Sequence, residues 1–269
     1  STHCISSAAS DVYKRQMALK APLVYETKHH LSYYECDATG HPSLSMLISM
    51  AVQVSEEHGN SLGLDTATIQ SYGGGWVITS YEGSFAARQP INGEEVILGT
   101  RAIANNRFFA LREFWIQSAD RQVEYVRLTG LFVYMNLQTR HLMSIPQAVI
   151  EPYHGPEKKR LPRLAKAREL QDVRFKNDYH VRFFDIDSNH HVNNARYFDW
   201  MQDPLGAEFL THHQLKHMTM RYEKEVRYGQ TVTSEISSPY RNENGELTTD
   251  HRIVVDGQLA AASTMTWNE

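Results

Sequence analysis

Cysteine is scarce in this sequence: Cys4 and Cys36 are its two cysteines among 269 residues. Two cysteines cannot form the multi-bridge framework of a small secreted scaffold, and a chain of this length buries enough core without one. Long apolar runs are also missing, since no stretch approaches the roughly 18 residues that a membrane-spanning helix needs. These absences predict a cytoplasmic protein with no membrane span.

An excess of positive charge is also absent. Twenty-seven lysines and arginines against 31 aspartates and glutamates give a net charge of −4, whereas dedicated nucleic-acid binders are usually strongly basic. The chain holds 14 histidines but no C-x-x-C or H-E-x-x-H spacing. Adjacent histidines such as His190 and His191 would point to opposite faces of a strand and chelate one ion poorly. We therefore expect no nucleic-acid partner, no metal and no cofactor.

Residues 1–16 show no helical or strand periodicity, and they lack the apolar core of a signal peptide. Within them, the run SDVYKRQ resembles translated sequencing-adapter read-through. We expect residues 1–16 to be a disordered or non-native leader, with Met17 as the natural start.

Residues 17–151 have the order of a strand, a long helix and an antiparallel meander. In the helical stretch, Leu47, Met50, Val54 and His58 fall on one face. Turn-forming segments such as QPING separate the β-rich stretches that follow. The predicted strands are 23–34, 76–85, 94–105, 107–118 and 122–137, and the predicted helix is 42–60.

The same order returns after a linker. Residues 152–172 are the predicted linker, because they hold three prolines and six basic residues without a convincing apolar face. In the second unit, 173–269, Pro204 should break or kink the helix that starts at Asn193. The predicted strands of this unit are 173–185, 216–227, 230–238, 246–256 and 258–267.

Superposing the two halves reveals an internal repeat. An offset of 150 residues pairs Asp37 with Asp187 and His41 with His191 at the same strand-to-helix corner, and past the longer first helix the offset falls to 141. A curved antiparallel sheet must cover its apolar face, and one long helix on the concave side does so. Two tandem units of this kind, with their sheets merged, predict an α+β fold with the double hotdog architecture.

The second corner carries a specific pattern. The segment FFDIDSNHHVNNARYFDWM, residues 183–201, is similar to the signature D-x-N-x-H-V-N-N of the acyl-acyl carrier protein thioesterases of bacteria and plant plastids. The segment 220–230 resembles a later strand of that family, and the resemblance covers about residues 22 to 267. It implies hydrolysis of the thioester bond of fatty acyl-acyl carrier protein, which releases free fatty acid in fatty acid biosynthesis.

One departure from the family pattern bears on the mechanism. Plant members have a cysteine directly after the glutamate that corresponds to Glu225, whereas this chain has Val226. Thiol catalysis requires a thiolate beside an imidazole, and Cys36 aligns with Ile186, so we interpret Cys36 as an apolar strand residue. The predicted catalytic residues are Asp187, Asn189, His191 and Glu225.

These side chains suffice for thioester hydrolysis. We expect Glu225 and His191 to activate water, Asn189 to bind the carbonyl or the water, and Asp187 to orient the corner. Backbone N–H groups near Val192 and Asn193 are candidates for an oxyanion site. The alternative for Asp187, Asn189 and His191 is purely structural: the first two form an Asx-type turn, and His191 packs beside it. The alternative for the Asn193–Asn194 pair is that one of them caps the helix.

The first half serves as an internal control. It has Thr39 where the second half has Asn189 and Ser84 where the second half has Glu225, so it lacks both the amide and the carboxylate. Corner structure explains the retained Asp37 and His41 but not the extra polar groups of the second half. We therefore expect one active site, in the second unit.

The resemblance also implies an acyl pocket in the first unit. Met46, Met50 and Trp76 are the predicted pocket residues. The alternative is that the apolar helix residues serve only to pack the hydrophobic core, which is their usual role. Lys158, Lys159 and Arg160 are either a solvated linker or a landing patch for acidic acyl carrier protein, the partner that the resemblance implies. An acyl-CoA thioesterase or hydratase of the same fold and a non-catalytic acyl-binding module are the alternatives. A further homodimer and the preferred acyl length stay open.

Overall fold

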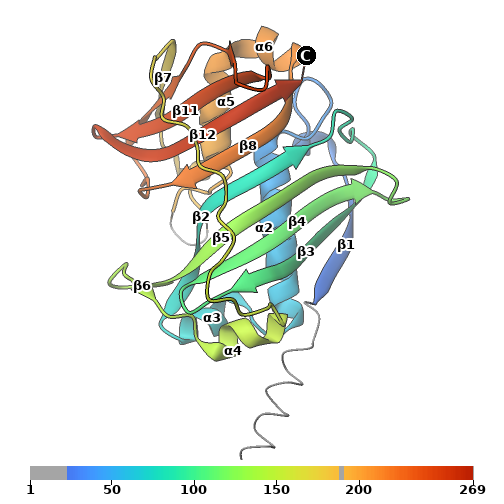
Figure 1. Ribbon diagram of the computed structural model, residues 1–269, viewed down its shortest axis with the longest axis vertical. Coiled ribbons are helices and arrows are strands. Elements are labelled where there is room, and N and C mark those ends of the chain that lie inside the picture. Colours follow the sequence, from blue (N-terminus) through green and yellow to red (C-terminus); the bar gives the residue numbers. More distant parts are fainter. Residues whose placement is uncertain (1–22, 188–190, 269) are drawn as a thin grey trace, which may run out of the picture.

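The computed structural model describes residues 23–187 and 191–268. One 12-stranded antiparallel sheet forms the body of this part of the chain (Figure 1). The predicted leader, 1–16, lies outside the described residues. Each half of the chain contributes one side of the sheet.

The first unit begins with β1 (Val24–His30) and the long helix α2 (Leu44–Ser61), close to the predicted helix. Its first strand is shorter than predicted, because the Ser32 N–H donates to the Glu35 carboxylate and a 3₁₀ turn, Tyr33–Glu35, replaces the end of the strand. The remaining elements are α3 (Thr66–Ser71), β2 (Gly74–Phe85), β3 (Glu95–Asn105), β4 (Phe109–Ser118), β5 (Glu124–Asn136), β6 (Leu142–Met143), α4 (Gln147–Ile150) and a 3₁₀ turn (Glu151–Tyr153).

The second unit repeats this order. Its first strand again ends early and gives way to a 3₁₀ turn, Phe183–Asp185. Pro204 follows the end of α5 and lies in a 3₁₀ turn, which confirms the predicted break. The elements are β7 (Phe175–His180), α5 (Arg196–Gln202), a 3₁₀ turn (Asp203–Leu205), α6 (Gly206–His212), β8 (Gln214–Tyr222), β9 (Thr231–Ile236), β10 (Tyr240–Arg241), β11 (Leu247–Val255) and β12 (Gln258–Asn268).

The strand order reflects the duplication. Across the sheet it is β1-β3-β4-β5-β2-β8-β12-β11-β9-β7, with β6 on β5 and β10 on β11. The second half of this order repeats the first in reverse. At the centre β2 pairs with β8 antiparallel, and Ser80 lies opposite Arg221, its counterpart at the offset of 141 residues. Two copies joined edge to edge about a pseudo-twofold axis produce this arrangement, so the predicted double hotdog is confirmed.

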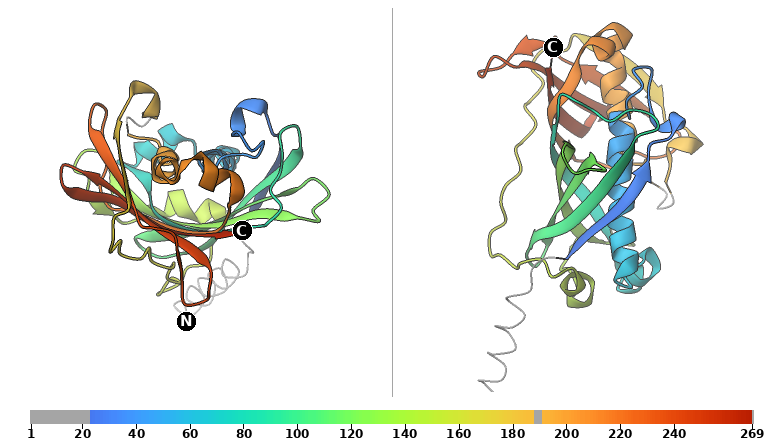
Figure 2. Two further views of the ribbon diagram at one scale, coloured as in Figure 1. Left: turned by 90° about the horizontal axis from the view of Figure 1, so that it is seen from above. Right: turned by 90° about the vertical axis from the view of Figure 1, so that its right-hand side faces the viewer.

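The sheet curves around the helices, which lie in its hollow (Figure 2). Helix α2 begins after Ser43, whose Oγ accepts a hydrogen bond from the Met46 N–H at 3.3 Å. The predicted apolar face of α2 is buried against the sheet, since Leu47, Met50 and Val54 are at most 5% exposed. The core thus lies between the concave face and a helix on which hydrophobic residues recur every three or four positions.

The segment between the units crosses the opposite, convex face of the sheet (Figure 2). The Lys158 N–H donates to the Asn105 carbonyl at 2.8 Å, which ties the start of the segment to β3 of the first unit. Further along, the Arg168 N–H donates to Thr264 Oγ1 at 2.8 Å, which ties it to β12 of the second unit. The segment therefore binds to strands of both units as it crosses.

Two buried histidines, His251 and His58, have lowered pKa values. Burial lowers the pKa of His251 to about 4; its Nδ1 lies 2.9 Å from the Met201 carbonyl at the end of α5. Burial, with the nearby charge of Arg112 as a smaller cause, also lowers the pKa of His58 on α2 to about 4. Both imidazoles are neutral in the folded protein, whereas the unfolded chain protonates them near pH 6.5.

The free energy of unfolding should therefore fall as the pH drops from 6.5 towards 4. The unfolded state binds more protons in this window, and each histidine contributes up to about 1.4 kcal/mol per pH unit. Urea unfolding at pH 7 and pH 5 measures this loss, and His251→Asn should reduce it. Equal unfolding free energies at pH 7 and pH 5 would contradict the buried neutral state of these side chains.

Candidate active site

The corner between β7 and α5 is built by backbone hydrogen bonds. The Asp187 N–H donates to the His191 carbonyl at 2.8 Å, and the His191 N–H donates to Asp187 Oδ1 at 3.3 Å. The Asn193 N–H donates to the Asp185 carbonyl at 2.9 Å, so this group is not available for the predicted oxyanion site. Predicted Asn189 lies outside the described residues, and its role stays a prediction.

The same corner exists in the first unit, as the offset of 150 residues predicts. There the Asp37 N–H donates to the His41 carbonyl at 2.9 Å, and Asp37 Oδ1 accepts hydrogen bonds from the N–H and hydroxyl of Thr39. Isolated bridges join Cys36 to Pro42 and Ile186 to Val192 at matching positions. Among the described residues, the two corners thus share the Asp-to-His backbone hydrogen bond and the isolated bridge.

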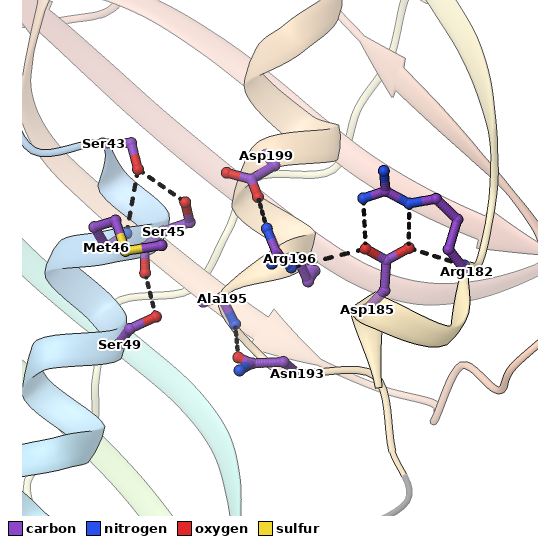
Figure 3. Close-up of polar contacts among 10 residues, drawn as sticks. All are labelled: Ser43, Ser45, Met46, Ser49, Arg182, Asp185, Asn193, Ala195, Arg196 and Asp199. Atoms are coloured by element: carbon purple, nitrogen blue, oxygen red, sulfur yellow. Dashed lines mark hydrogen bonds and ion pairs between the residues drawn. The ribbon is translucent and has the colours of Figure 1, made fainter. Parts of the chain in front are cut away.

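A buried carboxylate supports the second corner, and the sequence reasoning missed it. Asp185 is 1% exposed and accepts hydrogen bonds from the Arg182 N–H at 2.9 Å and the Arg182 guanidinium at 2.8 Å (Figure 3). Arg196 at the start of α5 lies 3.7 Å from the same carboxylate. Although burial alone would raise the pKa of Asp185, these interactions hold it below its usual range. The internal repeat could have revealed Asp185, since the offset of 150 residues pairs it with another carboxylate, Glu35.

The start of α5 lies beside the first turn of α2 (Figure 3). Asn193 Oδ1 accepts a hydrogen bond from the Ala195 N–H at 2.9 Å in the turn before α5, but the N-cap of α5 is Ala195, with no side-chain cap hydrogen bond, so neither Asn193 nor Asn194 caps this helix. The Tyr222 hydroxyl donates to the Asn194 carbonyl at 2.9 Å and anchors this turn to β8. The helix begins at Arg196, later than predicted, because residues 193–195 form a turn in which the Ala195 and Arg196 N–H groups both donate to Asn193.

His191 and Glu225 come together at this corner. Nε2 of His191 lies 3.6 Å from Oε1 of Glu225, and about one third of each side chain is exposed. The prediction that Glu225 lies on a strand is wrong. Strand β8 ends at Tyr222, because the N–H groups of Glu223 and Lys224 both donate to the Ala260 carbonyl. The loop 223–230 instead presents Glu225 at the surface, and Val226 after it is fully buried.

A third charged group reaches the pair from the first unit. Arg140, in the turn between β5 and β6, forms an ion pair through Nη2 with Oε1 of Glu225. The sequence reasoning assigned no role to Arg140. The site therefore contains groups from three segments: the corner, the loop after β8 and the β5–β6 turn.

Cys36 lies in the first unit's corner and carries a free thiol. Burial raises the pKa of this thiol, and the charges of Glu35 and Asp37 raise it further. A raised pKa disfavours the thiolate that nucleophilic catalysis needs, in agreement with the structural interpretation of Cys36.

The predicted pocket residues lie in different parts of the first unit. Met50 packs between α2 and the sheet beside Val54, Leu98 and Phe114, in an apolar layer that leaves no room for a water molecule. Met46 is partly buried at the end of α2 that faces the second corner. Trp76 packs against Phe132 and Tyr134, beside the apolar cluster of Ala110 and Val149 rather than the cluster that contains Met50.

Within 23–187 and 191–268, no cluster of three or more His, Cys, Asp or Glu side chains could hold a metal ion. Across the same ranges, no helix combines the length and apolar character needed to cross a membrane.

Fold and site together define the class: a tandem hotdog protein with a carboxylate–imidazole pair at the corner of its second unit. The chain belongs to the acyl-acyl carrier protein thioesterase family. The description "Acyl-ACP thioesterase N-terminal domain" matches residues 22–153, and "Acyl-ACP thioesterase C-terminal domain" matches residues 168–269. These matches confirm the resemblance seen in the sequence.

Individual relatives agree with this assignment. The crystal structure of a Lactobacillus plantarum protein, assigned as an oleoyl thioesterase, is 42% identical with a TM-score of 0.88, over 94% of this chain and 98% of that one. The 12:0-ACP thioesterase of Umbellularia californica shares the fold, with a TM-score of 0.81 at 20% identity over 91% of this chain and 94% of that one. A chloroplastic palmitoyl-acyl carrier protein thioesterase of Gossypium hirsutum is 25% identical over 87% of this chain. The chain spans 61% of that protein's length.

Proposed function

We propose that this protein hydrolyses the thioester bond of fatty acyl-acyl carrier protein and releases the free fatty acid. The observation that carries the proposal is the pair of His191 and Glu225, 3.6 Å apart at the second corner of a chain that belongs to this family. The Lactobacillus plantarum relative, assigned as an oleoyl thioesterase, supports the same activity.

In the proposed reaction, water attacks the carbonyl carbon of the thioester while the Glu225–His191 pair accepts a proton from that water. The C–S bond then breaks, and the electron pair leaves with sulfur. A thiolate has low basicity, so the leaving group needs little protonation before departure and takes up a proton afterwards. Asp187 holds the backbone of His191, and Asn189 keeps its predicted role at the carbonyl or the water.

Thiol release over a panel of acyl carrier protein thioesters, from short to long acyl chains, tests this proposal. We expect catalytic release of the carrier thiol and of one fatty acid per thioester. Faster turnover of acyl-CoA would favour an acyl-CoA thioesterase, and water addition to an enoyl thioester without thiol release would favour a hydratase. Stoichiometric retention of the carrier without thiol release would favour an acyl-binding module.

The carrier is the proposed macromolecular partner, and its docking surface is a separate question. Lys158, Lys159 and Arg160 are exposed, but their segment runs over the convex face, whereas the second corner rises on the concave side (Figure 2). A carrier docked on that basic run would have to extend its acyl group around the sheet edge. Of the two sequence interpretations, the solvated linker therefore fits this placement better.

Met50→Trp should shift the preference towards shorter acyl chains. Met50 packs between α2 and the sheet in the unit to which the family resemblance assigns the acyl pocket, and each methylene excluded by the larger ring removes about 0.8 kcal/mol of favourable burial. The ratio of kcat/KM for long and short acyl carrier protein thioesters measures the shift. As a matched control, Met143→Trp changes a methionine that packs against a different apolar cluster, and it should leave the ratio unchanged. An unchanged ratio in Met50→Trp would remove this residue from the acyl pocket.

A further inference from the structure

Arg140 occupies an unusual backbone position. Asn136 Oδ1 accepts hydrogen bonds from the N–H groups of Gln138 and Thr139, and the Arg140 N–H donates to the Asn136 carbonyl at 3.0 Å. This tight turn ends with Arg140 at φ 59°, in the left-handed region that few non-glycine residues adopt. Glycine would fit this backbone position with less strain, so the turn does not account for an arginine.

The guanidinium of Arg140 extends from this turn to a carboxylate of the other unit. Its Nη2 pairs with Oε1 of Glu225, the oxygen that also faces Nε2 of His191 at 3.6 Å. The side chains are 30% and 34% exposed, so about two thirds of each is shielded from solvent. A carboxylate has two oxygens, so Oε1 can stay with Arg140 while Oε2 accepts a hydrogen bond from water.

We propose that Arg140 is a positioning residue of the active site, through which the first unit holds the ionised Glu225 carboxylate beside His191. This inference rests on the proposed hydrolysis. The loop 223–230 belongs to no strand or helix, so an ion pair to a separate segment fixes a carboxylate that the loop alone would hold less firmly. The position of the catalytic base, Glu225, would then depend on how the first unit packs against the second.

Arg140→Gly is the sharpest test, because glycine removes the guanidinium and suits the left-handed backbone. We expect kcat for acyl carrier protein thioesters to fall about 10- to 100-fold, the scale of one charge-assisted hydrogen bond, with little change in KM. Arg140→Lys keeps a positive charge and should recover part of this loss.

Arg121→Gly is a matched control. Arg121 also has a left-handed φ, 61°, and pairs with Glu26 of β1 away from the site. This variant removes the same side chain from an equivalent backbone position, and it should keep kcat near the wild-type value.

The pH profile and a double-mutant cycle separate positioning from a general effect on folding. An opposite charge favours the ionised carboxylate, so the acidic limb of kcat/KM should move to higher pH in Arg140→Gly and stay in place in Arg121→Gly. Among the described residues, Arg140 from the turn and His191 from the corner form ion pairs with Glu225, and its own loop also carries Glu223, Lys224 and Arg227. In a Glu225→Gln background, Arg140→Gly should add less than about twofold.

Three outcomes would overturn the inference. If the wild type releases thiol and Arg140→Gly matches it in kcat and pH profile, Arg140 does not position Glu225. If only KM rises, Arg140 contacts the carrier or its prosthetic group instead. If the wild type itself releases no thiol from any acyl carrier protein thioester, the proposed function fails and the inference fails with it.

Discussion

His191→Ala should lower kcat by about 10²- to 10⁴-fold, whereas His41→Ala should leave kcat within about threefold of the wild type. His191 faces Glu225, while the Nδ1 of His41 lies 2.9 Å from the Pro90 carbonyl, a contact that only supports the first corner. The two histidines occupy equivalent positions of one repeated corner, so the comparison controls for the loss of an imidazole.

Steady-state thiol release from the same acyl carrier protein thioester measures both variants, at a temperature where circular dichroism shows each to be folded. Equal losses of turnover would mean that both corners catalyse, and the division of labour between the units would be wrong.

Glu225→Gln should have an effect of similar size, about 10²- to 10⁴-fold in kcat. Glutamine keeps the shape of the side chain and its hydrogen bonding to Arg140, but it cannot accept the proton of the attacking water. KM should change little, because the charge acts on the water rather than on the acyl chain.

Glu223→Gln is the control for this substitution. Glu223 lies in the same loop, is exposed and pairs with Arg221 instead of His191. Its amide variant should keep near-normal turnover. Near-normal thiol release by Glu225→Gln would remove Glu225 from the mechanism and leave His191 without its carboxylate partner.

The duplication was readable from the sequence because corner residues are constrained by backbone geometry. In Asp37 and Asp187 alike, the backbone N–H donates a hydrogen bond and the carboxylate accepts one within a tight turn. Both copies of the repeat therefore have an aspartate at the same position of the turn. Hydrophobic periodicity likewise predicted α2 to within two residues at its start and one at its end. Local patterns thus predicted the units and their order.

Strand ends were predicted less well, because side chains compete with the sheet for backbone groups. The Glu35 and Asp185 carboxylates each accept a hydrogen bond from a backbone N–H three residues earlier, which ends both first strands early. Glu225 was predicted on a strand for a related reason. The sequence does not mark the end of the strand at Tyr222, but the N–H groups of Glu223 and Lys224 both donate to the Ala260 carbonyl of β12, which ends the strand there.

The sequence grouped His191 with Glu225 but gave no sign of Arg140, and the catalytic roles of the motif residues stay predictions. His191 and Glu225 belong to recognisable segments, and tertiary structure brings them to 3.6 Å. Arg140 belongs to no pattern, because its role depends on how the β5–β6 turn meets a loop of the other unit. Contacts between distant segments leave no periodic signal in a single sequence.

Intact-protein mass spectrometry during turnover tests most directly whether Glu225 and His191 activate water without a covalent intermediate. The protein is mixed with a fatty acyl-acyl carrier protein, quenched at times from well below one turnover to steady state, and weighed. We expect the mass of the unmodified chain at every time, with thiol and fatty acid released together and no burst of thiol. An acyl adduct that forms and decays at the rate of turnover, on Cys36 or on a carboxylate, would contradict direct attack by water.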